Sequence, residues 1–471
     1  MSLAKQPSLA SRILLISTYE LGHQPWNLAS PLAMLARAGF DATGIDASVE
    51  PLPQALAAQA WFIGLSLPMH TATRLALPLI AQIRRLNPAA TICAYGLYAA
   101  LNADYLLASG VDFVIGGEFE APLVSLVQAL SRGEPAPAAG VSSRDHAAAP
   151  HLARLAFAVP QRQGLPPLSR YAHLVVDGRR IPAGYVEASR GCLHTCLHCP
   201  ITPIYQGRFF VVPQDVVLAD MRSQVEAGAG HITFGDPDFL NGPRHGLSMA
   251  RALHREFPHV TFDITTKIEH ILQHRSLFRE LKTLGCVFVV SAVESFSDTV
   301  LAHLAKGHTR ADIYAALAIL ADAGIPMRPS LLPFTPWTSL ADYVDLLAQV
   351  EALGLIGQID PVHYTIRLLL PPSSPLLSQP DAAGWLGLLQ ASELTHDWRA
   401  ADPRLDALQR DAAALVAAAA DNGEAPVVTF YRLKALALAA AEGEAAPADI
   451  PSPAGLPVME PTPHLTEAWF C

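Results

Sequence analysis

Three cysteines lie within eight residues of one another, at Cys192, Cys196 and Cys199, in the segment EASRGCLHTCLHCPITP. Their spacing is CxxxCxxC, and a short run that predicts a strand stands directly before it. Cysteine thiolates are the usual ligands of iron–sulfur clusters. Three such ligands leave one iron of a 4Fe–4S cluster open to a small molecule, which indicates catalysis and not electron transfer alone.

Zinc is the alternative metal for this loop. A structural zinc site takes four nitrogen or sulfur ligands, and His194 or His198 supplies the fourth in that interpretation. Zinc motifs usually come as two separated pairs, and the sequence has no second pair. The pattern therefore favours iron–sulfur chemistry. A zinc or iron–sulfur binding or sensing module is the non-enzymatic alternative.

The composition limits the class of protein. Of the 471 residues, 51% are hydrophobic and 16% are charged, and the formal net charge is −10. Such a chain has enough apolar residues for a large core, and it lacks the clustered Lys and Arg of nucleic-acid binding. No apolar stretch approaches the ~20 residues of a membrane span, and the run at 13–16 lacks the cleavage site of a signal peptide. We expect a cytoplasmic protein that binds neither nucleic acid nor membranes.

Apolar runs alternate with amphipathic segments near the N-terminus, and these runs lie at 12–18, 42–47, 61–67, 91–96 and 113–117. Continuous apolar strands separated by helices predict a parallel sheet that is covered on both faces. We expect a doubly wound, Rossmann-like domain over 1–135, with a ligand site beyond the carboxyl ends of its strands. Pro, Ala and Gly dominate 136–182, which predicts a linker on the surface.

A second series of strand–helix units follows, with strands expected at 184–189, 231–236, 261–267, 287–295, 326–334 and 363–371. This alternation predicts a partial (β/α)6 barrel of the TIM type over 183–380, with its chemistry on loops at the carboxyl ends of the strands. Residues 381–471 are expected to form a helical extension, with helices around 381–395 and 403–420, and a Pro-rich tail.

The position of CxxxCxxC after the first strand of such a barrel resembles the radical S-adenosylmethionine (SAM) superfamily. The resemblance implies that Cys192, Cys196 and Cys199 hold a 4Fe–4S cluster and that SAM chelates the open iron. An electron from the cluster would then cleave SAM to methionine and a 5′-deoxyadenosyl radical, which abstracts hydrogen from a small-molecule substrate. A reducing partner such as flavodoxin or ferredoxin would supply the electron.

Polar residues after the second and third barrel strands are candidate SAM contacts. Gly235, Asp236 and Asp238 in GDPDFLNG resemble the segment that binds the amine of SAM, with an Asx-Pro turn as the alternative. Lys267 and Glu269 are candidates for the carboxylate and the ribose of SAM. Alternatively, these two residues pair with each other on a solvated rim.

Further candidates stand elsewhere around the barrel mouth. Glu294 ends the fourth strand, and His198 takes a place beside the adenine pocket where the superfamily often has an aromatic residue. Arg328 and Arg367 interrupt apolar runs. Each would meet a carboxylate of SAM or of the substrate through its fork of donors, or would form a salt bridge inside the barrel.

A Rossmann-like domain before this barrel resembles the cobalamin-binding radical SAM class. IGLSL (63–67) and GGEFEAPL (116–123) match the pattern of that class. Its DxHxxG signature is absent, and YELGHQPW (19–26) places His23 in a different context. The resemblance implies either bound cobalamin or a cobalamin-free domain, and it makes cobalamin-dependent methyl transfer the second enzymatic hypothesis.

The chain ends on TEAWFC, so Cys471 is a fourth candidate functional thiol. FTPWTSLADY (334–343), YTIRLLLPPSSPLL (364–377) and this tail resemble the uncharacterised CUAEP/CCAEP-tail radical SAM proteins, whose tails carry Cys followed by selenocysteine or a second Cys. The resemblance implies a chain truncated at a selenocysteine codon, with an accidental terminal cysteine as the alternative. A tail thiol would bind a soft element or act as a redox partner.

Overall fold

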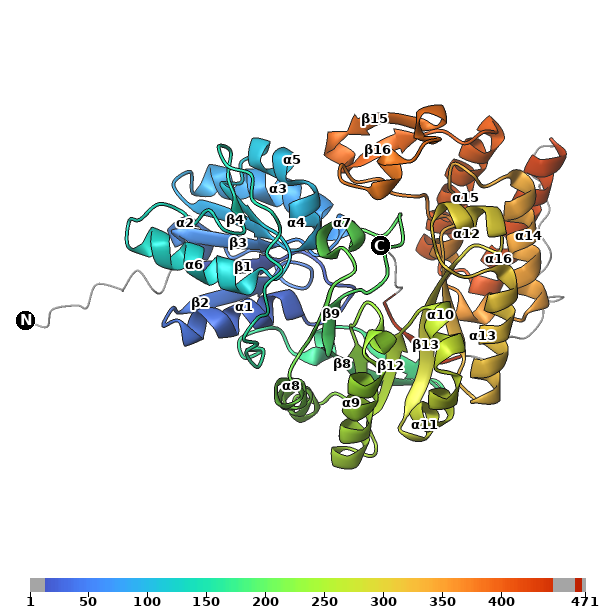
Figure 1. The fold of residues 1–471 in the computed structure, drawn as a ribbon, viewed down its shortest axis with the longest axis horizontal. Coiled ribbons are helices and arrows are strands. Elements are labelled where there is room, and N and C mark those ends of the chain that lie inside the picture. Colours follow the sequence, from blue (N-terminus) through green and yellow to red (C-terminus); the bar gives the residue numbers. More distant parts are fainter. Residues whose placement is uncertain (1–12, 444–461, 468–471) are drawn as a thin grey trace, which may run out of the picture.

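The computed structural model describes residues 13–443 and 462–467. It is a mixed α/β fold built on two large sheets, the N-terminal one in blue and the second one in green and yellow (Figure 1). The second sheet curls into a half-barrel. Among the described residues, no helix has both the length and the apolar character that crossing a membrane requires.

The N-terminal sheet has the strand order β2-β1-β3-β4-β5-β6. Its parallel strands are β1 (Ile13–Ser17), β2 (Ala42–Asp46), β3 (Phe62–Ser66), β4 (Thr91–Tyr95) and β5 (Phe113–Ile115), and β6 (Val141–Ser142) is antiparallel to β5. These five parallel strands confirm the predicted apolar runs. The runs are continuous because both faces of the sheet are covered.

Helices pack on both faces of this sheet. They are α1 (Trp26–Arg37), α2 (Gln54–Gln59), α3 (His70–Leu86), α4 (Leu97–Leu101), α5 (Ala103–Ala108) and α6 (Glu120–Ser131). Leu28 of α1 and Leu123 of α6 share one apolar cluster with Leu15. Ile80 of α3 packs with Leu14 on the opposite face.

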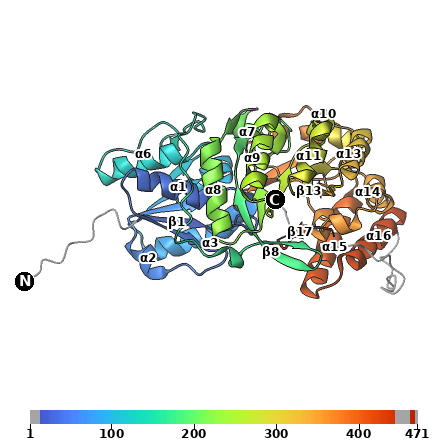
Figure 2. The same cartoon turned by 90° about the horizontal axis from the view of Figure 1, so that it is seen from below.

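The second sheet has the order β14-β13-β12-β11-β8-β7-β17. Its parallel strands are β8 (Arg179–Val186), β11 (His231–Phe234), β12 (Thr261–Thr265), β13 (Cys286–Glu294) and β14 (Met327–Leu331). The helices that follow these strands are α8 (Gln214–Glu226), α9 (Pro243–Glu256), α10 (Ile268–Gln273), α11 (Phe278–Thr283), α12 (Asp298–His303), α13 (Arg310–Asp322) and α14 (Leu340–Ala352). They follow the strands around the outside of the curve (Figures 1 and 2).

The predicted sixth barrel strand at 363–371 is wrong. The chain forms a 3-10 turn at Pro361–Tyr364, and only a single bridge joins Arg367 to Phe334. Leu368 and Leu370 are buried, so the apolar run reflects burial and not a ladder of hydrogen bonds. A buried loop and a buried strand cannot be told apart by apolar character alone.

The predicted helix around 381–395 is also wrong. This segment forms a hairpin of β15 (Leu386–Gln390) and β16 (Thr395–Trp398), with Leu394 at φ 61° in the turn. Gly384 and Gly387 lower its helix propensity. The hairpin reaches the N-terminal part, where the Glu393 carboxylate lies 2.9 Å from the Arg74 guanidinium of α3.

The other C-terminal helices are α15 (Pro403–Asp421) and α16 (Pro426–Glu442). The helix α15 confirms the helix expected at 403–420. The helix α16 was not predicted from the sequence. Both lie at the end of the molecule opposite the N-terminal sheet (Figure 2).

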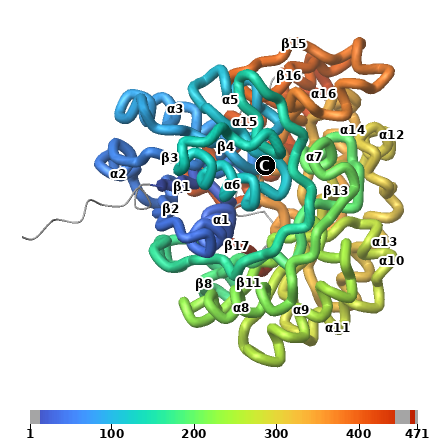
Figure 3. Tube along the Cα trace, turned by 60° about the vertical axis from the view of Figure 1, so that its left-hand side comes forward, coloured from blue at the N-terminus to red at the C-terminus, as the bar shows by residue number. Residues whose placement is uncertain are grey.

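The segment 136–182 is more than the surface linker that its composition predicts. It crosses from the N-terminal sheet to the second sheet (Figure 3), and it contributes β7 (His173–Val176), antiparallel to β8. Phe157 and Leu168 are buried, and the Arg162 guanidinium pairs with Asp220 of α8 at 2.7 Å. The buried apolar and charged residues of this Pro-rich stretch are isolated and do not repeat at the period of a helix or a strand. The sequence pattern therefore did not predict that the segment packs against the rest of the molecule.

Residues 462–467 pack back onto the molecule. The strand β17 (His464–Leu465) pairs antiparallel with β7, and Tyr19 Oη donates a hydrogen bond to Glu467 Oε1 at 2.6 Å. Gly22 has φ +68°, and a Cβ there would lie 2.6 Å from Glu467 Cγ, so only glycine fits under this side chain. Cys471 and the predicted function of its thiol lie outside the described residues.

Candidate active site

The cysteine loop follows the carboxyl end of β8 and is bracketed by a small antiparallel sheet of β9 (Ser189–Gly191) and β10 (Phe209–Val211), with the short helix α7 (Thr202–Tyr205) after the last cysteine. Gly191 has φ +72°, and a Cβ there would lie 2.5 Å from the Arg208 carbonyl oxygen. Directly before Cys192, the backbone therefore requires glycine.

The structure brings the three predicted ligands together as free thiols. Cys196 is buried, and Cys192 and Cys199 are partly exposed. Burial raises the pKa of Cys199 to about 12, and the neighbouring thiols add to this shift. Burial also raises the pKa of Cys192. Thiolates form in such surroundings when a metal neutralises them, because metal binding displaces the protons.

A buried ion pair stands beside the thiols at the end of β13. Glu294 Oε1 lies 3.0 Å from Lys306 Nζ and 3.2 Å from His198 Nε2. Burial opposes ionisation of Glu294, but Lys306 and His198 hold the pKa of this carboxyl well below its usual range. The positive charge of Lys306 also acts on the Cys196 and Cys199 thiols. Glu294 has φ 63°, a strained conformation that is common at functional sites.

Asp236 connects the end of β11 to the cysteine loop. Its carboxylate accepts hydrogen bonds from the Ala188 N–H at 3.0 Å and from Ser189 Oγ at 2.5 Å. Burial raises its pKa to about 6. At Gly235 a Cβ would lie 2.0 Å from the Tyr185 ring, so this position has no room for a side chain. Both residues therefore fix the backbone that faces the cysteines.

Asp238 lies opposite the cysteine loop and is fully buried. Its Oδ1 accepts hydrogen bonds from Thr266 Oγ1 at 2.7 Å and from the Leu240 N–H at 3.1 Å. Lys267 and Glu269 form an ion pair with each other, which is one of the two alternatives that the sequence left open.

Arg328 and Arg367 each form a salt bridge, and the partner of Arg367 belongs to α15 and not to the inside of the barrel. Arg328 Nη2 lies 3.0 Å from Asp360 Oδ2. Arg367 Nη1 lies 2.6 Å from Asp406 Oδ1, and its guanidinium stacks 3.5 Å from the centroid of the Trp398 ring. Their contact with SAM stays a prediction.

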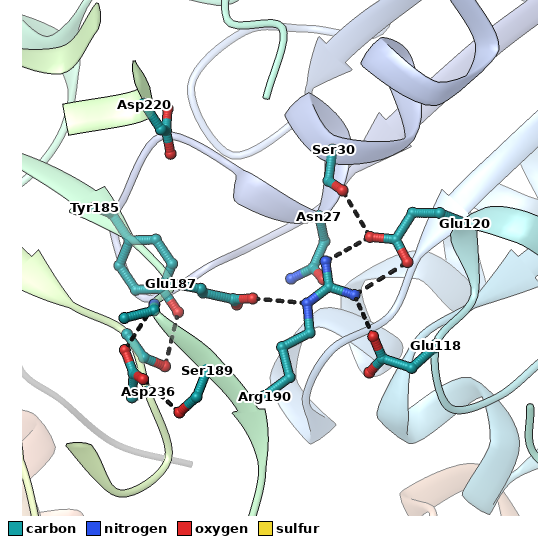
Figure 4. Close-up of polar contacts among 12 residues, drawn as sticks. Asn27, Ser30, Glu118, Glu120, Tyr185, Glu187, Ser189, Arg190, Asp220 and Asp236 are labelled. Atoms are coloured by element: carbon teal, nitrogen blue, oxygen red, sulfur yellow. Dashed lines mark hydrogen bonds and ion pairs between the residues drawn. The ribbon is translucent and has the colours of Figure 1, made fainter. Parts of the chain in front are cut away.

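Arg190, which the sequence did not single out, is the centre of a buried network between the two sheets (Figure 4). Its guanidinium lies 3.1 Å from Glu118, 2.5 Å from Glu120 and 3.0 Å from Glu187. It also stacks 4.1 Å from the centroid of the Trp26 ring. Charged residues are rarely buried unless they are paired. The isolated charged residues in the segments GGEFE and EASRG were therefore the signal in the sequence that could have indicated this network.

This network carries more negative than positive charge, because three carboxyls face one guanidinium. Burial raises the pKa of Glu187 to about 8, although Arg190 opposes the shift. Burial, partly offset by Arg190, also raises the pKa of Glu118. Glu20, on the N-terminal side of the same interface, has its pKa raised to about 8 by burial. Part of the surplus charge is therefore neutralised by bound protons near neutral pH.

These shifts predict the pH dependence of folding. The Glu187 carboxyl loses its proton near the ordinary value of 4.5 in the unfolded chain and near 8 in the folded chain. Between these values the folded state binds more protons, so the free energy of unfolding falls as pH rises. We expect Glu187→Gln to reduce this fall, measured by urea denaturation at several pH values in that window. Glu134→Gln, at an exposed carboxyl, is the control, and an equal slope in wild type and Glu187→Gln would contradict the assignment.

A cavity of about 190 Å³ lies where the two sheets face each other. Glu20, Gly96 and Phe119 line it from the N-terminal part, and Glu187 and Arg190 line it from the second sheet. A larger cavity of about 610 Å³ lies beside the loop after β1, between Tyr19 and Tyr171, and no residue of the cysteine loop lines it.

Comparison with known proteins places this site in a family. Residues 186–347 match the model of the radical SAM superfamily, a range that includes all three cysteines. Residues 186–347 are therefore a radical SAM domain.

One relative is similar in sequence to about half of this chain. The chain is 25% identical over 230 residues to the hopanoid C-3 methylase of Methylococcus capsulatus, a match that covers 48% of this chain and 43% of that protein. The chain thus matches less than half the length of this relative.

Two solved structures share most of the fold. The radical SAM methyltransferase TsrM from Kitasatospora setae, solved with cobalamin and a [4Fe–4S] cluster, has a TM-score of 0.61 at 18% identity, over 78% of this chain and 77% of that one. The cobalamin-dependent SAM radical enzyme OxsB, solved with aqua-cobalamin and SAM, has a TM-score of 0.69 at 14% identity, over 92% and 71%. At these identities the likeness is one of fold.

Proposed function

We propose that this chain is a radical SAM enzyme that acts on a small-molecule substrate. Cys192, Cys196 and Cys199 would hold a 4Fe–4S cluster, which when bound would supply the electron for the reductive cleavage of SAM to methionine and a 5′-deoxyadenosyl radical. The observation that carries the proposal is the set of three free thiols in one loop at the carboxyl end of β8, within a domain that matches the radical SAM superfamily. An electron-donating protein such as flavodoxin or ferredoxin is the expected partner.

The surroundings of the thiols suit a polar cofactor. Several buried side-chain atoms near the loop have no hydrogen-bond partner, among them Asn241 Nδ2, His198 Nδ1 and His308 Nδ1. Buried polar atoms are rarely left unpaired unless a ligand, an ion or water satisfies them. Gly235, Asp236, Asp238, Lys267, Glu269 and Glu294 lie at the ends of β11, β12 and β13, and we propose that SAM binds among them.

Lys306 is the residue that we add to the predicted set. A cluster bound by three thiolates is anionic, and a buried charge is stable when an opposite charge stands nearby. Lys306 supplies that charge, and Glu294 fixes the position of its ammonium group at 3.0 Å. Asp236 has a different role, because it holds the Ala188 and Ser189 backbone from which the loop departs.

We propose the domain arrangement that the sequence indicates. Residues 1–135 form a cobalamin-binding-like Rossmann domain, 136–182 connect it to the radical SAM core at 183–380, and 381–471 form an extension. The helices on both faces of the N-terminal sheet and the curled second sheet support this division.

Cobalamin-dependent methyl transfer is the second candidate, because TsrM and OxsB, both solved with cobalamin, are similar in fold to most of this chain. The residues present do not fit a corrin in the space between the sheets. That cavity is about 190 Å³, and ligand pockets usually measure ~300–1,000 Å³. Arg190 and Glu187 line this cavity, and Arg190 pairs with three carboxyls. We therefore derive no step through cobalamin. Corrinoid absorbance retained by the protein after gel filtration with hydroxocobalamin would reverse this conclusion.

The proposed function is tested by anaerobic reconstitution with iron and sulfide, followed by SAM and dithionite. We expect methionine and 5′-deoxyadenosine as products, measured by liquid chromatography with mass spectrometry. A reconstituted protein that carries the cluster but releases no product of SAM cleavage would contradict the proposal. Zinc in place of iron at the cysteines would instead favour the binding or sensing module.

A further inference from the structure

Three potential metal ligands converge on one point beside the cysteine loop. They come from segments far apart in the chain: His194 from the loop itself, Asp238 from the turn after β11, and His270 from α10. One ligand atom from each residue lies within 4.8 Å of the others. The sequence analysis considered His194 only as a fourth ligand for a zinc ion held by the cysteines.

The facing atoms of these residues are buried and make no hydrogen bonds. His194 Nε2, Asp238 Oδ2 and His270 Nδ1 each lack a hydrogen-bond partner. The Asp238 side chain is 0% exposed, the His270 side chain 10% and the His194 side chain 21%. Asp238 Oδ2 lies 2.8 Å from His270 Nδ1 and 3.5 Å from His194 Nε2. These three atoms lie close together without the geometry of a hydrogen bond. Their lone pairs are therefore available to one cation that all three share.

The distances suit a metal ion. Two ligands at ~2.1 Å from one metal and roughly 90–110° apart lie about 3.0–3.4 Å from each other. The contacts of 2.8 and 3.5 Å bracket this range. Asp238 supplies a carboxylate oxygen and the two histidines supply imidazole nitrogens, which are donor types that Zn²⁺ accepts.

Surrounding contacts orient two of the ligands. Asp238 Oδ1 is held by Thr266 and by the Leu240 N–H, which leaves Oδ2 to point toward the imidazoles. His194 Nδ1 lies 3.5 Å from Glu269 Oε2. A carboxylate against one ring nitrogen of a histidine, with the other nitrogen on the metal, is the usual arrangement of metal-binding histidines.

We propose that His194, Asp238 and His270 form a binding site for a divalent transition metal ion that is distinct from the cluster held by the cysteines. Two imidazoles and one carboxylate suit Zn²⁺ or Fe²⁺ and leave at least one coordination position for water or a substrate atom. The site uses no cysteine, so its metal can be measured without SAM cleavage. It assigns Asp238 to the metal and leaves SAM to the other residues proposed above.

The test uses the full chain with its cluster reconstituted, loaded with Zn²⁺ and separated from excess metal by gel filtration. We expect about one zinc per chain in addition to the iron, measured by mass spectrometry of the elements. His270→Gln and Asp238→Asn should lose the zinc and keep iron and sulfide. A residue that merely orients a ligand costs ~10–100-fold in metal affinity when it is removed, so the loss of a direct ligand should cost at least as much.

His274→Gln is the matched control, because its ring lies 5.6 Å from that of His270 but is not one of the three ligands. It should retain the zinc. Co²⁺ provides a second readout, since visible d–d bands should appear in wild type and His274→Gln and be absent from Asp238→Asn. Equal zinc in all four proteins would overturn the proposal. So would iron lost together with zinc in His270→Gln and Asp238→Asn, or weaker SAM binding in these variants with the metal content unchanged.

Discussion

Cys196→Ala is expected to reduce the cleavage of SAM to the background of the reagents. Cys196 is the most deeply buried of the three thiols in the loop, with 6% of its surface exposed. Two remaining thiolates cannot hold a cubane in the arrangement that leaves one iron open, since cysteine thiolates are the ligands that these clusters use. The measurements are the iron and sulfide content, the visible absorption of the cluster, and the yield of 5′-deoxyadenosine.

Cys286→Ala is the control for this experiment. Cys286 is a buried cysteine of β13 in the same sheet, and the pKa of its thiol is raised by burial, as expected for an inert core residue. The variant loses one buried sulfur and should retain the cluster and the activity. If Cys196→Ala retained the iron content and product yield of Cys286→Ala, the three-cysteine assignment would be wrong.

Arg190→Met should destabilise the folded chain by about 3–5 kcal/mol, the usual cost of breaking a buried ion pair by removing one partner. Methionine keeps an apolar stem against Trp26 but leaves Glu118, Glu120 and Glu187 without a cation. The carboxyls must then bind protons or admit water. The measurement is the denaturant midpoint followed by tryptophan fluorescence, and the effect should be larger at high pH than at low pH.

Arg132→Ala is the matched control, because the Arg132 guanidinium pairs with Glu134 at 2.7 Å on the surface, where more than half of each side chain is exposed. Exposed ion pairs contribute little to stability because solvent screens them, so this variant should unfold almost as the wild type does. Adding Glu120→Gln to Arg190→Met should recover part of the lost stability, because it removes one uncompensated carboxylate. Equal midpoints for Arg190→Met and Arg132→Ala would show that the network does not stabilise the fold.

Much of the fold was predictable, because burial leaves a periodic trace in the sequence. The five parallel strands of the N-terminal sheet and the five parallel strands of the second sheet follow apolar runs. The same signal failed at 363–371, where an apolar run is buried without strand pairing, and at 381–395, where glycines permit a hairpin. The segment 136–182 gave no periodic signal, although Arg162 and Phe157 pack inside the molecule.

The sequence by itself determined the three-cysteine loop and its place after a strand, because those ligands lie within one short segment whose spacing is fixed covalently. Only the tertiary structure decided that Arg190 meets carboxyls of the N-terminal part, that Lys306 faces the thiols, and that His194, Asp238 and His270 share one point. These groups come from separate elements. Their proximity depends on how the strands are ordered and curled, which is set by packing between distant segments and leaves no local pattern.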